Sequence, residues 1–396
     1  MKRRGSESER FFTAEERWAG FGPYYALFPA EFVKSVVRER TDPGDLILDP
    51  FSGRGTAPFA AAQLGRSGVG AEINPVGWIY LSVKSDPAPC SDVIAKLEEV
   101  VRASRHFPAN ERTGKEDFDK FLSLCFAPRV AAFIRVARET LDWRADPVDR
   151  TLAAFIIYYL HGKEGQALSN RMTQTKAMWP KYCMKWWSER GCIPPDLDIV
   201  KFLGKRIRWR YKKGSSRIAP VLSVLGDSSE TLSEGSPAEN WILEASEGRG
   251  ASLLITSPPY LGVTDYHADQ WLRLWALGFA PSVIREAAGT PIGGEIGHKG
   301  RFYDVKSYGK LLTTVFSNAR RLLSHDAAVF VRAGKNRRTL DVVRKVLLSV
   351  FPEKVFEEFE RPFGVSAQTK AIGNKSGSSG EVDLVSIESP RKRRAA

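Results

Sequence analysis

The residues best suited to chemistry lie in four short segments, each of which follows an apolar run. The first is Asp49-Pro-Phe-Ser-Gly-Arg-Gly-Thr56, which follows Leu-Ile-Leu and precedes an Ala-rich stretch. Its glycines let the backbone pass close to a ligand, and a helix N-terminus offers free N–H groups. The segment lacks the spacing and the Lys-Ser/Thr ending of a Walker phosphate loop, and it lacks a complete G-x-G-x-x-G pattern. The acidic Asp49 instead favours a ligand that carries positive charge.

Two more carboxylates follow strand-like runs. Glu72 lies 23 residues after Asp49, and nucleotide-binding βαβ units place an acid at roughly 20 residues to accept bonds from ribose hydroxyls. Asp227 stands in Leu225-Gly-Asp-Ser228, just past another apolar run. Taken alone, each could be a helix-capping or solvated acid, so their weight comes from their combination with the other segments.

The fourth segment, Leu253-Leu-Ile-Thr-Ser-Pro-Pro-Tyr260, is an apolar strand that ends in a polar residue, two prolines and an aromatic ring. The prolines remove two backbone donors and stiffen the turn, so the carbonyl oxygens there point in a fixed direction. Rigid acceptors beside an aromatic ring suit a planar base whose exocyclic amine must be oriented.

Together the four segments resemble the motifs of the S-adenosylmethionine-dependent DNA amino-methyltransferases, which methylate the exocyclic amine of cytosine or adenine. Two features depart from the family's pattern. A long helical segment, residues 86–215, is inserted between the second and third of these motifs, and Arg54 stands where the family usually has a small residue between the glycines. The segments that resemble motifs I, II, III and IV are 49–56, 71–75, 224–228 and 256–260, and residues 21–29 more weakly resemble the motif X arm that closes over the cofactor.

The resemblance implies S-adenosylmethionine as the cofactor. Asp49, Phe51 and the glycines would line its methionine portion, Glu72 would bind the ribose, and Asp227 would bind the adenine amine. The cofactor-binding residues expected on this basis are Tyr24, Asp49, Pro50, Phe51, Ser52, Gly53, Gly55, Thr56, Glu72, Asn74, Asp227 and Ser228, and the expected catalytic residues are Ser257, Pro258, Pro259 and Tyr260.

The same residues suggest a mechanism. An aromatic amine is a poor nucleophile because its lone pair is delocalised into the ring. Hydrogen bonds from its N–H groups to the Ser257 side chain and the Pro258 carbonyl would favour a tetrahedral nitrogen, and positioning for in-line attack supplies much of the rate. A base inside a duplex is out of reach, so it would be flipped out and stacked on Tyr260. No cysteine lies in a Pro-Cys context at this site, which argues against carbon-5 methylation.

Ser257 ahead of Pro-Pro-Tyr is mostly associated with cytosine in this family, whereas Asp or Asn there is mostly associated with adenine. We therefore expect a site-specific DNA cytosine-N4 methyltransferase of a restriction–modification or defence system, in which a separate restriction endonuclease would be the partner. An adenine-N6 enzyme of the same fold, an RNA amino-methyltransferase and a non-catalytic nucleic-acid binder remain alternatives. A mere binder would need neither the acidic residues nor Ser-Pro-Pro-Tyr, which disfavours the last of these.

The elements that must position these residues follow an α/β pattern. A strand at 45–49, a helix at about 56–64 and a strand at 69–72 predict a βαβ unit and a parallel, Rossmann-like sheet. A Gly/Ser loop without a crossover helix joins the last two strands, which predicts a C-terminal antiparallel hairpin. Further strands are expected at 221–225, 253–256, 327–332, 355–360 and 382–387, and further helices at 30–40, 266–278, 304–324 and 338–350.

Residues 86–215 show helical spacing without strands and form a mainly helical insertion. The expected domains are 1–85 and 216–390 for the two halves of the methyltransferase, 86–215 for the insertion, and 391–396 for a basic tail. Lys201–Lys213 carries seven positive charges among thirteen residues, interleaved with aromatic side chains, although a solvated basic helix would look the same. The residues expected to bind nucleic acid are Arg171, Lys176, Lys205, Arg206, Arg208 and Arg210.

Composition narrows the class of protein further. The 396 residues carry a formal net charge of +13, which indicates a polyanionic partner, although charge alone does not distinguish nucleic acid from a need for solubility. The resemblance implies that this partner is double-stranded DNA. No apolar run reaches the roughly 18 residues of a membrane span, and the four cysteines form neither a disulfide framework nor a zinc pattern. We expect a prokaryotic, cytoplasmic, nucleoid-associated protein without a metal site, whose oligomeric state is open. His267 and His298 are expected to be structural or to position substrate.

Overall fold

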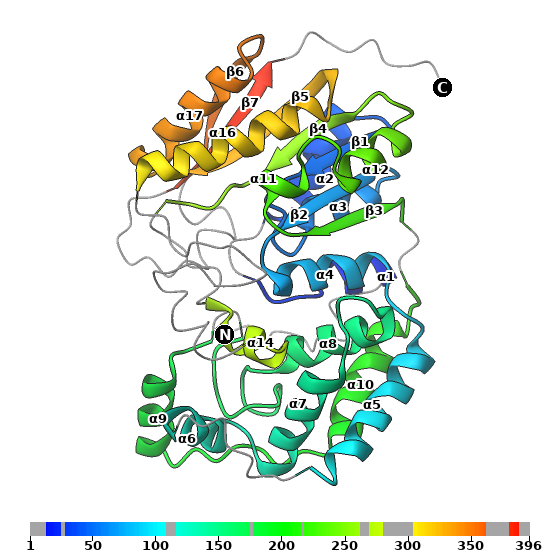
Figure 1. Cartoon of the computed structure of the whole chain (residues 1–396), viewed down its shortest axis with the longest axis vertical. Helices are drawn as coiled ribbons and strands as arrows, with labels where there is room; N and C mark the ends of the chain where they lie inside the picture. The colour runs from blue at the N-terminus through cyan, green and yellow to red at the C-terminus, as the bar shows by residue number, and fades with distance from the viewer. Residues whose placement is uncertain are drawn as a thin grey trace, which may run out of the picture. The chain divides into compact units, whose positions relative to one another are not determined.

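The computed structural model describes residues 13–24, 28–107, 116–174, 177–215, 218–261, 269–279, 304–361 and 380–387. These residues form two compact units. The sheet unit holds the described residues of 25–81, 218–265 and 293–396, and the helical unit holds those of 1–24, 82–217 and 266–292. Figure 1 shows the elements of both units.

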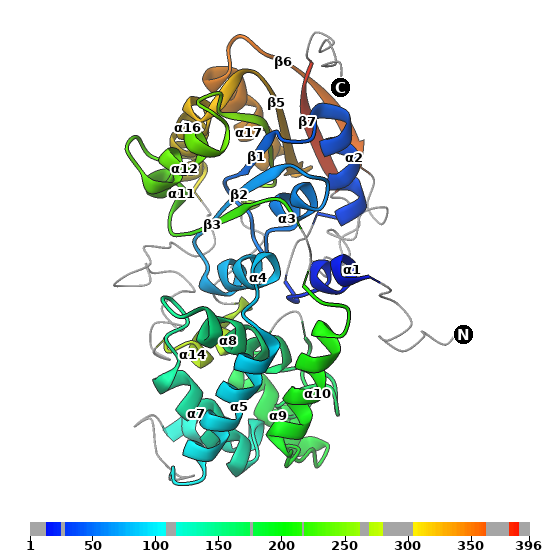
Figure 2. The same ribbon diagram turned by 90° about the vertical axis from the view of Figure 1, so that its right-hand side faces the viewer.

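The described part of the sheet unit contains seven strands in the order β3-β2-β1-β4-β5-β7-β6. β4 is labelled in Figure 1, and the other strands are labelled in Figure 2 as well. The first five pair in parallel, whereas β7 is antiparallel to both β5 and β6. The predicted parallel sheet and the predicted C-terminal antiparallel hairpin are therefore confirmed. The strands are β1 (Leu46–Asp49), β2 (Ser67–Glu72), β3 (Val221–Leu225), β4 (Ala251–Thr256), β5 (Leu323–Gly334), β6 (Val355–Arg361) and β7 (Glu381–Ile387).

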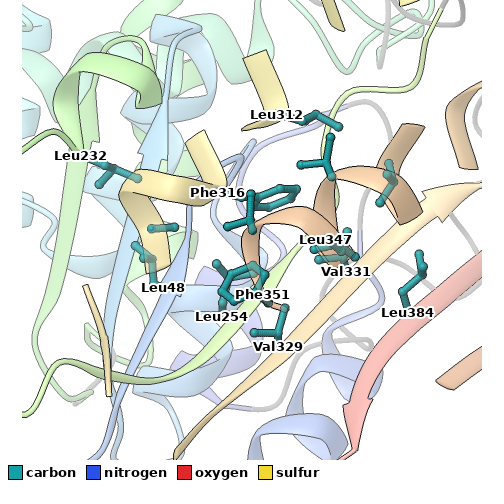
Figure 3. Close-up of a cluster of buried hydrophobic side chains, with 14 of the residues drawn as sticks. Leu48, Leu232, Leu254, Leu312, Phe316, Val329, Val331, Leu347, Phe351 and Leu384 are labelled. Carbon is teal, nitrogen blue, oxygen red and sulfur yellow. The ribbon is translucent and has the colours of Figure 1, made fainter. Parts of the chain in front are cut away.

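Helices cover both faces of this sheet. Alternate side chains along β1 and β4 point to opposite faces, so Leu48 and Leu254 join one apolar cluster while Ile47 and Leu253 join the other. Two-sided burial explains why these strands are almost continuously apolar. The first cluster is completed by α12 (Pro237–Ala245), α16 (Val305–Arg321) and α17 (Arg337–Val350), as Figure 3 shows in part, and the second by α2 (Ala30–Arg40) and α3 (Thr56–Ala62).

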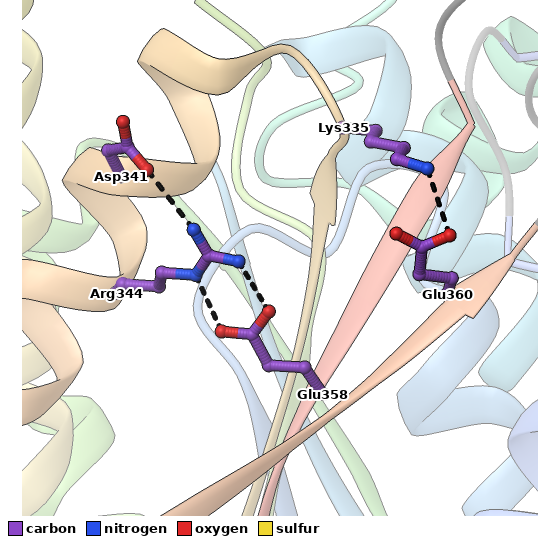
Figure 4. A network of polar contacts seen from close by, with 5 residues as sticks. All are labelled: Lys335, Asp341, Arg344, Glu358 and Glu360. Atoms are coloured by element: carbon purple, nitrogen blue, oxygen red, sulfur yellow. Dashed lines mark hydrogen bonds and ion pairs between the residues drawn. The ribbon is translucent and has the colours of Figure 1, made fainter.

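The edge strand β6 is flanked by charged pairs (Figure 4). Arg344 of α17 binds both carboxylate oxygens of Glu358 at 2.5 Å, and Lys335 binds Glu360 at 2.9 Å. Such partly exposed pairs contribute little stability. Charged side chains along an edge strand do, however, discourage pairing with the strands of another molecule.

The described part of the helical unit contains eight helices and no strand beyond the isolated bridge between Gly162 and Arg171. The expectation of a mainly helical insertion is therefore confirmed. The helices are α1 (Ala14–Ala19), α5 (Cys90–Ser104), α6 (Glu116–Cys125), α7 (Pro128–Thr140), α8 (Pro147–Tyr159), α9 (Pro180–Glu189), α10 (Ile199–Tyr211) and α14 (Trp271–Ala276), and α4 (Pro75–Ser85) runs from the sheet unit into the helical unit.

Two segments outside the expected insertion pack within the helical unit. Trp18 of α1 is buried edge-on against Phe155 of α8 and Tyr211 of α10. Trp271 of α14 is likewise buried against Phe121 of α6. The aromatic core of the helical unit thus draws on three separate parts of the chain. Across the described residues, no helix combines the length and the apolar character needed to cross a membrane.

Candidate active site

The strand order reverses at β1, because β2 and β3 lie to one side of it and β4 and β5 to the other. In open α/β sheets, ligands bind outside the carboxyl ends of the strands at such a point. Asp49 ends β1 and Thr256 ends β4, and the Thr256 hydroxyl donates to Asp49 Oδ1 at 2.7 Å. Both side chains are buried. The first and fourth sequence segments therefore meet at the point where the topology predicts a ligand.

A tight glycine turn follows Asp49. Gly53 and Gly55 have φ angles of 54° and 69°, a left-handed conformation that favours glycine. A Cβ atom on Gly55 would also lie 2.3 Å from Leu81 Cδ1, so no other residue fits there without movement. Between them and Asp49, the Ser52 N–H donates to Ala71 O at 3.0 Å, while the buried Ser52 Oγ has no hydrogen-bond partner among the described residues.

Two carboxylates of this site have unusual acidities. Burial raises the pKa of Asp49 to about 7, although its hydrogen bonds with Thr256 and Phe51 oppose that rise. Burial also raises the pKa of Glu72 to about 7, helped by the negative charge of Asp49 and opposed chiefly by the hydrogen bond from the Asn74 N–H. Near neutral pH both groups are poised between neutral and charged forms. A positively charged ligand would favour the charged form of each.

The end of β3 joins the same edge. Gly226 N–H donates to Glu72 O at 3.0 Å, and the buried Ser228 hydroxyl donates to Pro50 O at 2.5 Å. Asp227 caps the short helix α11 (Ser228–Thr231), because its Oδ1 accepts from the Ser229 N–H at 2.8 Å and from the Ser229 hydroxyl at 2.7 Å. The segments around Asp49, Glu72 and Asp227 are therefore locked together by hydrogen bonds.

Two of the expected cofactor residues have evident structural tasks. Asn74 is completely buried, and its Oδ1 accepts from the Val76 N–H at 3.0 Å in the first turn of α4. Ser228 holds the Pro50 carbonyl, as described above. We therefore interpret both side chains as supports for the loops. Pro50 and Thr56 are buried within the glycine turn, and Phe51 packs edge-on against Phe316 of α16 at 6.3 Å.

The segment Ser257-Pro-Pro-Tyr260 directly follows β4. Tyr260 is 7% exposed, and its hydroxyl accepts a long hydrogen bond of 3.4 Å from Ser257 and donates to Glu381 Oε1 at 3.0 Å. Pro258 is buried, and Pro259 is partly exposed. Glu381 was missed by the sequence analysis. In the sequence, Glu381 is only an acidic residue at the start of an apolar strand. That position does not reveal that its partner is Tyr260.

Three further candidates are not among the described residues of the sheet unit. Tyr24 is buried in the helical unit, so it is not among the residues that the sheet unit assembles. His267 and His298 lie outside the described residues. Within the described ranges, no group of three or more His, Cys, Asp or Glu side chains is arranged to hold a metal ion, and the cysteines are free thiols.

Most of the basic segment Lys201–Lys213 lies in helix α10 of the helical unit. Lys205 and Arg208 are exposed on it, whereas Arg206 is half-buried with its guanidinium 3.5 Å from the centre of the Phe202 ring. Arg210 is 2% exposed, lies over the Phe21 ring at 5.0 Å and donates to the Arg17 carbonyl. The prediction that Arg210 binds nucleic acid is therefore wrong for this structure, because its charge is turned into the core of the unit.

The remaining basic candidates lie outside α10. Arg171 is exposed and forms an ion pair of 2.6 Å with Glu164, and Lys176 lies outside the described residues. A further surface is formed by α9 and its N-cap, where Trp179 is 45% and Tyr182 58% exposed. Lys181 and Lys185 are also exposed there. This α9 surface combines aromatic rings with positive charge.

Comparison with known proteins gives consistent results. A family model described as DNA methylase matches residues 2–76. Type II methyltransferase M.Cfr9I of Citrobacter freundii is 43% identical over 54 residues, 14% of this chain and 18% of that protein. M.XycI of Xanthomonas campestris pv. cyanopsidis is 39% identical over 65 residues, covering 16% and 21%. M.HpaI of Haemophilus parainfluenzae is 25% identical over 113 residues, covering 24% and 36%.

The chain thus spans about a fifth of the length of the first two relatives. A solved structure described as the rRNA methyltransferase aviRa from Streptomyces viridochromogenes aligns over 97% of this chain and 93% of its own, with 11% identity and a TM-score of 0.31. That score is too low to bear on fold or function, so the fold assignment depends on the sheet order itself. Segments of the chain are thus similar to a DNA methylase family and to Type II methyltransferases, and this similarity implies S-adenosylmethionine as the methyl donor.

Proposed function

We propose that this protein transfers a methyl group from S-adenosylmethionine to the N4 amine of cytosine in DNA. The observation that carries the proposal is the bond between Thr256 and Asp49. It joins the strand end that precedes Ser257-Pro-Pro-Tyr260 to the strand end that opens the glycine turn. A base held by the first and a cofactor held by the second would therefore be neighbours.

The residues of the glycine turn fit the cofactor. S-adenosylmethionine carries a positively charged sulfonium, which supplies the transferable methyl group, and the carboxylates of the buried Asp49 and the partly exposed Glu72 offer opposite charge. The unpartnered Ser52 Oγ is a buried polar atom that a ligand could satisfy. Glu72 would bind the ribose, and Asp227 would accept from the adenine amine through the oxygen that does not cap α11.

Ser257 and Tyr260 would hold the target base. The amine N–H groups would donate to Ser257 Oγ and to the Pro258 carbonyl, which favours a tetrahedral nitrogen with a free lone pair. Tyr260 would provide the stacking surface for the flipped base. Because the chemistry needs no protein nucleophile, catalysis comes from positioning and from bonds that strengthen in the transition state.

The helical unit supplies surfaces suited to DNA. Lys205 and Arg208 on α10 can neutralise phosphates, and the exposed rings of Trp179 and Tyr182 on α9 can stack against bases or sugars. We propose that these surfaces bind double-stranded DNA around the target and that they select the methylated sequence. The names of the relatives as Type II methyltransferases support a restriction–modification context.

The choice of cytosine rests on Ser257. Serine there is mostly associated with cytosine in the family, but its hydroxyl could equally accept from adenine. Adenine N6 is therefore the second candidate, because the same acceptors would serve its amine. A non-catalytic binder is disfavoured, since it would gain nothing from two carboxylates whose pKa values are raised at one edge of the sheet.

Sequencing DNA from a host that expresses the protein, with detection of modified bases, tests the proposal. We expect N4-methylcytosine within one defined sequence, and none in a host expressing Ser257→Ala. Finding only N6-methyladenine would change the target base to adenine, while the assignments of DNA as the substrate and S-adenosylmethionine as the methyl donor would stay. Methylated RNA with unmodified DNA would move the substrate to RNA. No methylation of either polymer by the folded, S-adenosylmethionine-binding protein would overturn the proposal.

A further inference from the structure

The hydroxyl of Tyr260 is hydrogen-bonded to a residue of β7, the strand that pairs with β5. Glu381, the first residue of β7, is completely buried, and its Oε1 accepts from the Tyr260 hydroxyl at 3.0 Å. In chain order these residues lie 121 positions apart. Nothing in the four sequence segments points to Glu381 as a partner of the proposed base-binding tyrosine.

The register of β5 and β7 makes this contact possible. Glu381 pairs directly with Gly334 across the two antiparallel strands. A Cβ atom on Gly334 would lie 3.1 Å from Tyr260 Cδ2 and 3.4 Å from Cε2, so the ring lies directly over a position that has no side chain. Gly334 thus makes room for the ring, and its cross-strand neighbour receives the hydroxyl.

A second pair holds Glu381 in place. Arg332 donates from Nε to Asp383 Oδ1 at 2.6 Å and from Nη2 to Oδ2 at 3.0 Å, and its Nη1 lies 3.9 Å from Glu381 Oε2. All three side chains are buried, and the guanidinium also lies 4.1 Å from the centre of the Phe32 ring. Buried ion pairs are rarely more stabilising than apolar packing. A role other than stability would explain why this network occupies the sheet.

The hydrogen bonds of the Tyr260 hydroxyl supply such a role. The Tyr260 hydroxyl donates to Glu381 Oε1 at 3.0 Å, and its oxygen accepts from the Ser257 hydroxyl at 3.4 Å. One hydroxyl group therefore joins the buried Glu381 both to the ring on which the base would stack and to Ser257, so a displacement of Glu381 would move both.

We propose that Glu381 is a positioning residue for methyl transfer, acting through the Tyr260 hydroxyl on both the ring and Ser257. This inference rests on the proposed function. Glu381 touches neither substrate nor cofactor. It fixes the plane on which the base would stack and, through the Tyr260 hydroxyl, the position of the Ser257 side chain.

Three substitutions test the chain of bonds, with transfer of tritiated methyl groups from S-adenosylmethionine to DNA as the readout. Tyr260→Phe removes the donor, Glu381→Leu removes the acceptor, and Glu381→Gln keeps an acceptor that can also rotate to donate. We expect Tyr260→Phe and Glu381→Leu to lower kcat by about 10- to 100-fold, the scale of a misplaced reacting group. Glu381→Gln should lie between these variants and the wild type.

The double variant Tyr260→Phe/Glu381→Leu should be no slower than the slower single variant, because both changes break the same hydrogen bond. Affinity for S-adenosylmethionine should stay unchanged in all of them, and exposed Glu360→Gln on β6 serves as the matched control. Melting temperatures show whether Glu381→Leu folds; if it does not, Tyr260→Phe still decides.

Two results would overturn the proposal: wild-type kcat and KM in Tyr260→Phe, or multiplicative losses in the double variant. If the wild-type enzyme itself transfers no methyl group to DNA, the proposed function fails, and the positioning role falls with it. If the wild type transfers methyl groups to DNA and Tyr260→Phe does so at the same rate, only the positioning role is refuted.

Discussion

The two units differ in how distance along the chain relates to the position of side chains in space. In the sheet unit, Asp49, Glu72 and Asp227 are separated by many residues, yet hydrogen bonds connect their segments at one edge. In the helical unit, Lys205, Arg208 and Arg210 are close neighbours in sequence, yet two are exposed and one is buried. Distance along the chain is therefore a poor guide to distance in the site.

Backbone geometry explains the difference. Parallel strands present their carboxyl ends at the same edge, so any residue that follows a strand is delivered there. An α-helix completes one turn every 3.6 residues, so adjacent side chains face different directions. A run of charges on α10 thus cannot form one surface, and the apolar Phe202 and Ile207 decide which charges face inward. The predictions below test this contrast.

The largest effect is expected from Ser257→Ala at the strand edge. Losing an acceptor whose bond strengthens in the transition state should lower kcat by about 10- to 1,000-fold. Binding of S-adenosylmethionine should be unaffected, because the hydroxyl does not belong to the glycine turn. Methyl transfer to DNA measures the first quantity and calorimetry the second, with the exposed Ser35→Ala on α2 as the control. An unchanged kcat would remove Ser257 from the site.

Next in size is the contribution of Asp227 to cofactor binding. Asp227→Ala should weaken S-adenosylmethionine binding by about 5- to 150-fold, which corresponds to a polar contact of about 1–3 kcal/mol. Asp227 also caps α11, so Asp227→Ser supplies the matched variant, since serine caps a helix about as well as aspartate. Both variants should bind weakly in calorimetric titration. Full recovery in Asp227→Ser would mean that Asp227 serves only as a cap.

The raised pKa values of Asp49 and Glu72 predict a pH dependence. A positive cofactor favours the charged carboxylates, so binding should release protons and weaken by about tenfold per carboxylate as pH falls from about 8 to about 6. Titrations in buffers of different ionisation enthalpy measure the protons released. Binding that is independent of pH would contradict the expected role of both carboxylates.

The same shifts predict the stability of the free protein. Because burial raises each pKa from its ordinary value to about 7, the folded protein holds more protons than the unfolded chain between these values. This contribution is fully present below the ordinary pKa and is lost as pH rises through about 7. Thermal melting should show the loss, and Asp49→Asn should reduce it.

The smallest effect is expected on α10. The double change Lys205→Ala/Arg208→Ala should flatten the salt dependence of DNA binding by about 0.9 in log–log slope for each phosphate contact removed. Arg210→Ala should leave the slope unchanged and instead destabilise the fold by about 1–3 kcal/mol, because the hydrogen bond to the Arg17 carbonyl is buried. Filter binding and melting curves measure the two effects. A slope that changes only in Arg210→Ala would reverse our interpretation of the helix.

Much of the fold was predictable from sequence. Apolar runs bounded by turns located every strand of the sheet, and the loop without a helix correctly predicted that β6 and β7 are antiparallel. These signals are local, because a strand buried on both faces must be apolar along its length. The packing of α1 and α14 in the helical unit was not predictable, since the aromatic residues around Trp18 come from distant parts of the chain.

For the site, the sequence alone determined the identity and strand-end placement of Asp49, Glu72, Asp227 and Ser257, because parallel topology converts spacing into a shared edge. Only the tertiary structure decided which side chains are available to act. It engaged Asn74 and Ser228 as supports, turned Arg210 inward and set Glu381 against Tyr260. The reason is physical: a side chain's partners depend on strand register and on the packing of remote elements, and neither is encoded in a short motif.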